Sequence, residues 1–95
     1  MVHILFASPA GERSLKKLPV GIRNFLIEEI NTLKNNPHAG KSLRGKLSKY
    51  YSLHIKLVGV EYRVVYEINN QAKEIIVHHV GTRENFYKEI ERKLK

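Results

Sequence analysis

The first half of the chain has the hydrophobic pattern of one strand followed by two helices. The apolar run Val2–Ala7 predicts a strand, and Ser8-Pro9 after it is typical of a helix start, with a hydroxyl N-cap and a proline at the first helical position. This helix is expected to end near Leu18, because Pro19 disfavours helical backbone at the residue before it. An apolar stripe at helical spacing then predicts a second helix, which forms a helical hairpin with the first. The stripe consists of Ile22, Leu26, Ile30 and Leu33.

The second half of the chain changes to the period-two alternation of β-strands. Ser52–Leu57 alternates between polar and apolar residues, and Tyr62–Ile68 does the same after a tight turn that contains Gly59. Glu74–Val80 is apolar on both faces, as expected of a central strand. The last predicted element is a helix from Glu84 to Lys95. Because short turns join the three strands, we expect them to form an antiparallel meander.

The order of these elements predicts a single α+β domain over residues 1–95. An N-terminal strand, a helical hairpin, a three-stranded antiparallel meander and a C-terminal helix follow one another. No segment approaches the roughly 20 apolar residues of a membrane span, and no signal peptide is visible. The chain also lacks cysteine, which excludes disulfides and thiol catalysis. We therefore expect a cytoplasmic protein with no membrane contact.

The excess of basic over acidic residues, and the absence of aspartate, limit the functions that the protein can have. The chain has 17 Lys and Arg residues against nine acids, a formal net charge of +8 that favours a polyanionic partner such as nucleic acid. All nine acids are glutamates, so the sequence has no aspartate for a Ser-His-Asp triad or for a metal cluster of the DxD type. We expect no cofactor and no metal, and any catalysis is expected to depend on cationic side chains.

Much of the positive charge lies in the middle of the chain. The stretch Ile30–Val60 contains six Lys or Arg residues and no carboxylate. Such a run is either a solvated loop, as most charge runs are, or a surface that binds RNA phosphates. Apolar residues continue through it from Leu43 to Leu53, which favours a folded surface over a disordered arm. The residues that we expect to bind RNA are Lys41, Arg44, Lys46 and Lys49.

Strand alternation gathers further cations on one face of the predicted sheet. In Ser52–Leu57 it places His54 and Lys56 away from the core, on the face that Arg63 shares in the next strand. With a turn centred on Gly59-Val60, Lys56 lies opposite Arg63, about 5 Å away. Like charges so close favour an anion site. Alternatively, both side chains bend into water, or a register shift of one residue separates them.

Further candidate residues surround the third strand. Arg83 is expected at the start of the last helix, where free N–H groups and the helix dipole favour anions. Tyr87 shares its face and is either a half-buried core tyrosine or a stacking platform for a base. Of His78-His79, one side chain is expected to point to the core and the other outward, without a third metal ligand. Glu67 is expected as a counter-ion of Arg63, or else as an aid to proton transfer.

Short motifs are distributed in a fixed order over essentially the whole chain. They are Ser8–Ala10, Lys17–Pro19, the Asn-x-Pro region that ends in Pro37, Leu43-Arg44-Gly45, Tyr51–Leu57, Tyr62–Tyr66, and Val80–Glu84 followed by Tyr87. Each is weak alone, but in this order and spacing they resemble the RelE/ParE superfamily of toxins from type II toxin–antitoxin pairs. The RelE branch fits better than the ParE branch. The resemblance implies a RelE-like fold, similar to that of microbial ribonucleases.

The resemblance also implies a ribosome-dependent mRNA endonuclease that inhibits translation. Toxins of the RelE branch cut mRNA in the ribosomal A site without a metal, by attack of the 2′-hydroxyl on the neighbouring phosphodiester. Carried over by position, Lys56 stabilises the transition state, Arg63 binds phosphate, Arg83 has an acid or charge-stabilising role, and Tyr87 stacks on the nucleotide. His54 stands where the family has a lysine. Its imidazole is suited to act as the base at neutral pH; alternatively, the toxin is slower or differently specific.

Two kinds of partner follow from this resemblance and from the charge. One is mRNA on the ribosome, with contacts to 16S rRNA through the basic patch. The other is an acidic RelB-like antitoxin, expected to cover the basic face or to displace the last helix. Two other functions stay open: a ParE-like gyrase-inhibiting toxin, which needs no catalytic constellation, and a catalytically weak basic RNA-binding relative.

Overall fold

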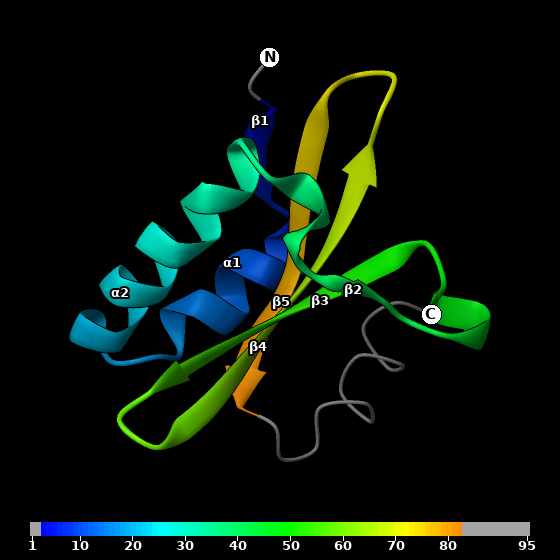
Figure 1. The fold of residues 1–95 in the computed structure, drawn as a ribbon. Helices are drawn as coiled ribbons and strands as arrows, with labels where there is room; N and C mark the ends of the chain where they lie inside the picture. The colour runs from blue at the N-terminus through cyan, green and yellow to red at the C-terminus, as the bar shows by residue number, and fades with distance from the viewer. Residues whose placement is uncertain (1–2, 83–95) are drawn as a thin grey trace.

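The computed structural model describes residues 3–82, which form an α+β fold around one five-stranded mixed sheet (Figure 1). Its strands are β1 (Ile4–Ala7), β2 (Lys41–Ser42), β3 (Tyr50–Leu57), β4 (Val60–Asn69) and β5 (Glu74–Thr82). Its helices are α1 (Pro9–Lys16) and α2 (Val20–Asn31), with short 3-10 helices η1 (Thr32–Lys34), η2 (Pro37–Ala39) and η3 (Gly45–Leu47). The helix expected from Glu84 to Lys95 lies outside the described residues. Within those residues, no helix is long and apolar enough to cross a membrane.

The sheet contains the predicted antiparallel meander and extends it at both edges. The strand order is β1-β5-β4-β3-β2. The N-terminal strand β1 pairs in parallel with β5, with Ala7 opposite Val77. The two-residue strand β2 pairs antiparallel with β3, with Lys41 opposite Ser52. The sequence did not predict either pairing, because both depend on contacts between distant segments and β2 is too short to show an alternation.

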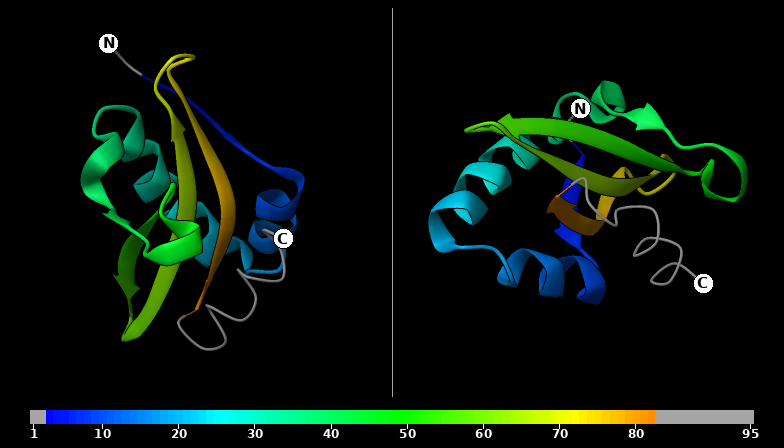
Figure 2. Two further views of the ribbon diagram at one scale, coloured as in Figure 1. Left: turned by 90° about the vertical axis from the view of Figure 1, so that its right-hand side faces the viewer. Right: turned by 90° about the horizontal axis from the view of Figure 1, so that it is seen from below.

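Both helices begin where the sequence predicts. Ser8 Oγ accepts a hydrogen bond from the Gly11 N–H at 3.1 Å, and Pro9 occupies the first helical turn. After Pro19, α2 runs across one face of the sheet, and α1 lies beside β5 (Figure 2). A hydrogen bond from the Val80 N–H to Ser14 Oγ, at 2.9 Å, connects α1 to β5. This bond satisfies a strand N–H that lies beyond the end of β1.

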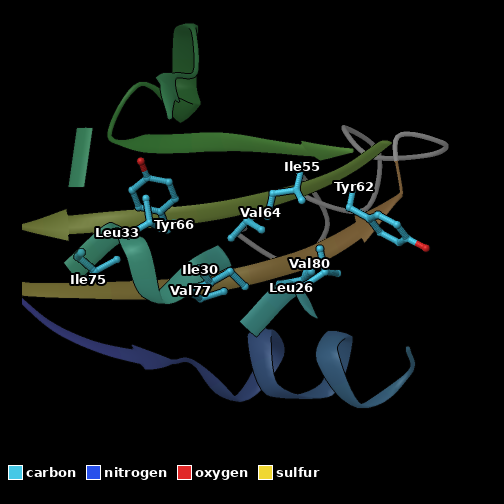
Figure 3. Close-up of a cluster of buried hydrophobic side chains, with 10 residues drawn as sticks. All are labelled: Leu26, Ile30, Leu33, Ile55, Tyr62, Val64, Tyr66, Ile75, Val77 and Val80. Carbon is cyan, nitrogen blue, oxygen red and sulfur yellow. The ribbon is translucent and has the colours of Figure 1, made fainter. Parts of the chain in front are cut away.

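The main core lies between α2 and the sheet, as the apolar stripes predict (Figure 3). Its buried members are Leu26, Ile30, Leu33, Ile55, Tyr62, Val64, Tyr66, Ile75, Val77 and Val80. A second, smaller cluster lies on the opposite face of the sheet, where Leu43 and Leu47 pack against Tyr50 and Val65. Val65 lies on the same face as Arg63 by strand alternation, and this cluster buries it fully. The segment from β2 to η3 covers that part of the sheet.

The turn between β3 and β4 lies one residue earlier than predicted. Val58 and Gly59 form it, both with positive φ, 49° and 78°, so that Leu57 pairs with Val60. Two consecutive residues with positive φ define the type I′ turn that suits the twist of a two-residue hairpin. The pairing differs from the predicted one by two residues, so every side chain keeps its predicted face of the sheet.

A bulge in β5 places His78 and His79 differently from the prediction. Val65 pairs with His79 and Tyr66 with Val77, which leaves His78 as the extra residue. Because Val77 and Val80 on either side both enter the main core, the two histidines lie on the other face, and the prediction that they point to opposite faces is wrong. His78 Nε2 lies 3.0 Å from Glu67 Oε1. His78, rather than Arg63, is the partner that the structure shows for this carboxylate.

Tyr66 ties the loop after α2 to the sheet. Its hydroxyl donates a hydrogen bond to the Pro37 carbonyl at 2.6 Å and accepts one from the Gly40 N–H at 2.9 Å. Burial raises the pKa of the Tyr66 hydroxyl, while the hydrogen bond from Gly40 acts in the opposite direction. The loop leads directly into β2, so this tyrosine also fixes where the basic segment begins.

Tyr66→Phe is expected to lower the free energy of unfolding by about 1–3 kcal/mol, because the variant leaves two partly buried backbone groups without their partner. A tyrosine in the unfolded chain ionises near pH 10, whereas folded Tyr66 keeps its proton to higher pH. The unfolded state then binds fewer protons, so this residue makes stability fall as the pH rises above about 10. Tyr66→Phe has no hydroxyl at this position to ionise, so its stability lacks this part of the fall at alkaline pH.

Equilibrium urea denaturation of the wild type and of Tyr66→Phe, at neutral and at alkaline pH, measures the loss of stability and its pH dependence. Tyr62→Phe is the matched control, because the Tyr62 hydroxyl makes no hydrogen bond to any described residue. Equal losses of stability in the two variants would contradict the role given to the Tyr66 hydroxyl.

Candidate functional site

The polar face of β3 and β4 holds the three described residues that were expected to be catalytic. His54 lies opposite Arg63, and Lys56 lies opposite Glu61. Side chains directly opposite each other are about 5 Å apart at Cβ, and diagonal neighbours are about 7–8 Å apart. His54 and Arg63 are therefore direct neighbours, with Lys56 on the diagonal. The predicted direct opposition of Lys56 and Arg63 is wrong, because the two-residue turn changes the pairing.

Glu61 is a further residue of the candidate site, and the sequence prediction did not include it. Its Oε1 lies 3.1 Å from His54 Nδ1, and the two side chains are 33% and 45% exposed. The available signal was the alternation in β4, which places Glu61 and Arg63 on the same face. A hydrogen bond at one ring nitrogen of a histidine sets the role of the other. With Nδ1 held by Glu61, His54 Nε2 is the nitrogen that can exchange a proton with a substrate.

A pocket of about 450 Å³ lies beside this pair, between the β2–η3 segment and β3. Three of the four residues expected to bind RNA line it: Lys41, Arg44 and Lys46. His54 and Ser52 line it from β3, and none of the eight described residues that line it is acidic. The fourth expected RNA-binding residue, Lys49, is exposed outside the pocket, with Nζ 5.1 Å from the centre of the Tyr50 ring. The pocket thus joins the basic run to the candidate catalytic face.

Apolar residues within the basic run hold the pocket in shape. Leu43 and Leu47 pack against Tyr50 and Val65, so the cations between them in the sequence stay at the surface. Ser42 Oγ donates a hydrogen bond to the Ser48 carbonyl at 2.9 Å, which closes the segment on itself. The basic run is a folded surface, as its apolar residues predicted.

Two of the expected site residues, Arg83 and Tyr87, lie outside the described residues. The structure therefore brings together His54, Lys56 and Arg63 of the expected catalytic set, and adds Glu61 to them. Among residues 3–82, no three His or Glu side chains gather in a way that could hold a metal ion.

Comparisons with known proteins give the family of this chain. A family model described as the ParE-like toxin of type II bacterial toxin-antitoxin systems matches residues 5–91. A search of curated proteins found no match. The fold is similar to a chain of the RelBE2 toxin–antitoxin complex from Mycobacterium tuberculosis, at 25% identity and a TM-score of 0.78, covering 87% of this chain and 100% of that one.

Two Escherichia coli structures are also similar. One is a mutant of the toxin RelE in the free state, at 22% identity and a TM-score of 0.75, covering 97% of this chain and 98% of that one. The other is a chain of the intact RelBE complex, at 25% identity and a TM-score of 0.71, covering 86% and 98%. The structural neighbours agree with the RelE-like fold that the motifs imply. The chain therefore belongs to the ParE-like toxins of type II toxin–antitoxin systems, within the RelE/ParE superfamily.

Proposed function

We propose that this toxin is a ribosome-dependent mRNA endonuclease that cuts in the A site by attack of the RNA 2′-hydroxyl, without a metal ion. The observation that supports it best is the position of His54, Lys56 and Arg63 on one face of β3 and β4, beside a cationic pocket. The reaction needs a base at the 2′-oxygen, positive charge around a pentacoordinate phosphate and an acid at the leaving oxygen. The described residues offer the first two.

His54 is the proposed base. Its Nε2 takes the proton of the 2′-hydroxyl while the 2′-oxygen bonds to phosphorus and the bond from phosphorus to the 5′-oxygen breaks. The products are a 2′,3′-cyclic phosphate and a 5′-hydroxyl, whose oxygen must gain a proton. Glu61 is a positioning residue, because its contact with Nδ1 orients the ring and stabilises the imidazolium that forms.

Arg63 and Lys56 are proposed to stabilise the negative charge that builds on the phosphate. A guanidinium offers two parallel donors to phosphate oxygens, and an ammonium adds a compact positive charge from the diagonal position. The resemblance gives Arg83 the acid or charge-stabilising role and Tyr87 the stacking contact with the nucleotide. Both roles are part of the proposal.

The second candidate function is a gyrase-inhibiting toxin. The observation that favours it is the family model, whose description is ParE-like. A gyrase inhibitor acts by binding protein and has no need for a base, a paired carboxylate and two cations on one face. That constellation favours the nuclease, or a catalytically weak RNA-binding relative that has kept the same surface.

The proposed partners are an acidic RelB-like antitoxin and mRNA on the ribosome. Two of the similar structures are toxin–antitoxin complexes, and the net charge of +8 suits an acidic segment that folds onto the toxin. Contacts with 16S rRNA are proposed through the exposed cations of the basic run, Lys41, Arg44, Lys46 and Lys49.

Induction of the toxin in cells, followed by primer extension on a reporter mRNA, tests the reaction. We expect cuts linked to codons in the translated region, which disappear in Arg83→Ala and fall steeply in His54→Ala, because the base contributes about 10²–10⁴-fold. His38→Ala is the matched control, since His38 is an exposed histidine of η2. Intact mRNA together with DNA breaks and an SOS response would overturn the proposal and identify the gyrase-inhibiting class.

A further inference from the structure

Ser52 is a buried polar residue in the wall of the cationic pocket. The residue is 4% exposed, and its Oγ has no hydrogen-bond partner among the described residues. Buried hydroxyls are almost always paired, because removal from water without a partner costs free energy. The alternation of β3 places Ser52 on the same face as His54, and both residues line the pocket. Its Oγ has almost no accessible surface, so a ligand in the pocket would supply the missing partner after the side chains that line the pocket move aside.

The pocket has the size of a small-molecule site. Its volume of about 450 Å³ falls within the range of roughly 300–1,000 Å³ that is typical of pockets for small organic ligands, well beyond what a single ion fills. The long cationic side chains around it are exposed, so they can change rotamer to admit a ligand. The pocket is also continuous with the proposed catalytic face through His54.

The walls of the pocket combine three kinds of chemistry. Leu43 and Leu47 provide an apolar surface anchored in the second hydrophobic cluster. Lys41, Arg44 and Lys46 provide positive charge, and no acid is among the lining residues within 3–82. Ser52 adds one hydroxyl with an unused hydrogen bond. A nucleotide has the matching parts: a flat apolar face, a phosphate, and polar atoms on the edge of its base. A glutamate-rich peptide would match the cations but has no flat apolar face to lie against the two leucines.

We infer that the pocket is a subsite for one RNA nucleotide next to the scissile phosphate, and that Ser52 selects among bases. The apolar face of the nucleotide lies against the two leucines, its phosphate contacts the cations, and Ser52 Oγ bonds a polar atom of the base. A buried polar group discriminates because a base that cannot satisfy it leaves it unpaired. The inference deepens the proposed function and rests on it for the reaction, whereas the binding of the nucleotide can be measured without cleavage.

Titration of the purified full-length toxin with the four nucleoside 5′-monophosphates, followed by NMR chemical shifts, tests the subsite directly. We expect saturable binding with a preference for one base, and shifts centred on the amides of β2, η3 and β3. Ser52→Ala is expected to weaken binding of the preferred nucleotide by about tenfold, so that the protein binds all four nucleotides with similar affinity. Ser52→Thr, which keeps the hydroxyl, is expected to restore the preference.

Two controls separate this result from loss of structure and from general charge effects. Ser48→Ala removes an exposed hydroxyl of the same segment and is expected to leave binding unchanged. Amide spectra that keep their dispersion show that each variant is folded. Absence of binding, or equal affinities for all bases in the wild type and in Ser52→Ala, would overturn the inference. So would a glutamate-rich peptide that shifts these amides when no nucleotide does.

Failure of the inference can be told apart from failure of the proposed function. If no mRNA is cut but the nucleotides bind with a preference that depends on Ser52, the subsite stands and the nuclease proposal falls. If mRNA is cut, Ser52→Ala is expected to broaden the sequence preference of the cuts. Cuts with unchanged preference in that variant would contradict the inference while supporting the nuclease.

Discussion

Arg63→Ala is expected to lower the rate of mRNA cleavage by about 10²–10³, the usual effect of removing one preorganised group that stabilises transition-state charge. Arg63 lies on β4 opposite His54 and diagonal to Lys56, where the reacting phosphate must sit if His54 is the base. Single-turnover cleavage of mRNA on purified ribosomes measures the chemical step. Arg63→Lys keeps the charge but loses the paired donors, so its cleavage rate is expected to lie between those of the wild type and Arg63→Ala.

The matched control for this experiment is Arg13→Ala. Arg13 is an exposed arginine in the last turn of α1, on a different element of the fold, so the variant loses the same charge and is expected to keep the wild-type rate. Thermal unfolding of all variants shows whether a lost rate reflects lost structure. If folded Arg63→Ala cleaves mRNA at the wild-type rate, Arg63 has no role in the mechanism. If Arg63→Ala and Arg13→Ala lose the same amount of cleavage rate, the effect of Arg63 comes only from the net charge of the protein.

Gly11→Ala is expected to lower the free energy of unfolding by about 3 kcal/mol, as overpacking at a rigid contact does. A Cβ at this position would collide with the Val77 carbonyl oxygen. That oxygen accepts the Ser8 N–H at 2.9 Å, so the strand cannot move aside without loss of this bond. A shift of α1 instead would break the hydrogen bond between Ser14 and Val80.

Gly21→Ala is the matched control for this second prediction. Gly21 also lies in a helix, and a Cβ there would meet nothing within 4 Å. Its replacement is expected to stabilise the protein by up to about 1 kcal/mol, because alanine loses less conformational entropy in a helix than glycine does. Equilibrium urea denaturation therefore compares two glycine substitutions that are expected to have opposite signs. A Gly11→Ala protein as stable as Gly21→Ala would show that α1 does not pack tightly on β5.

The candidate catalytic face could be predicted from the sequence as a set of residues, although not as a geometry. Alternation placed His54, Lys56 and Arg63 on one face, and a change of pairing by two residues preserves faces. Which residues are opposite depends on the turn. Val58-Gly59 lacks the Asn-Gly pattern of a type I′ turn and requires a β-branched residue at positive φ, so the sequence pointed to a different turn.

The pocket could not be predicted, because it needs β2 and η3 to fold back over β3. Their positions depend on Leu43 and Leu47 finding Tyr50 and Val65, contacts that periodicity within one element does not specify. For the same reason the burial of Ser52 could not be predicted: alternation places it on the polar face with His54, whereas the structure buries it.

By itself, the sequence determined the features that depend on neighbours along the chain. Among them are the cap at Ser8, the apolar stripe of α2, the faces of β3 and β4, the basic run without a carboxylate, and the motifs of the toxin superfamily. Only the tertiary structure decided the parallel pairing of β1 with β5, the bulge at His78 and the contact between His54 and Glu61. These features depend on packing between segments or on the geometry of a single turn, which hydrophobic periodicity does not encode.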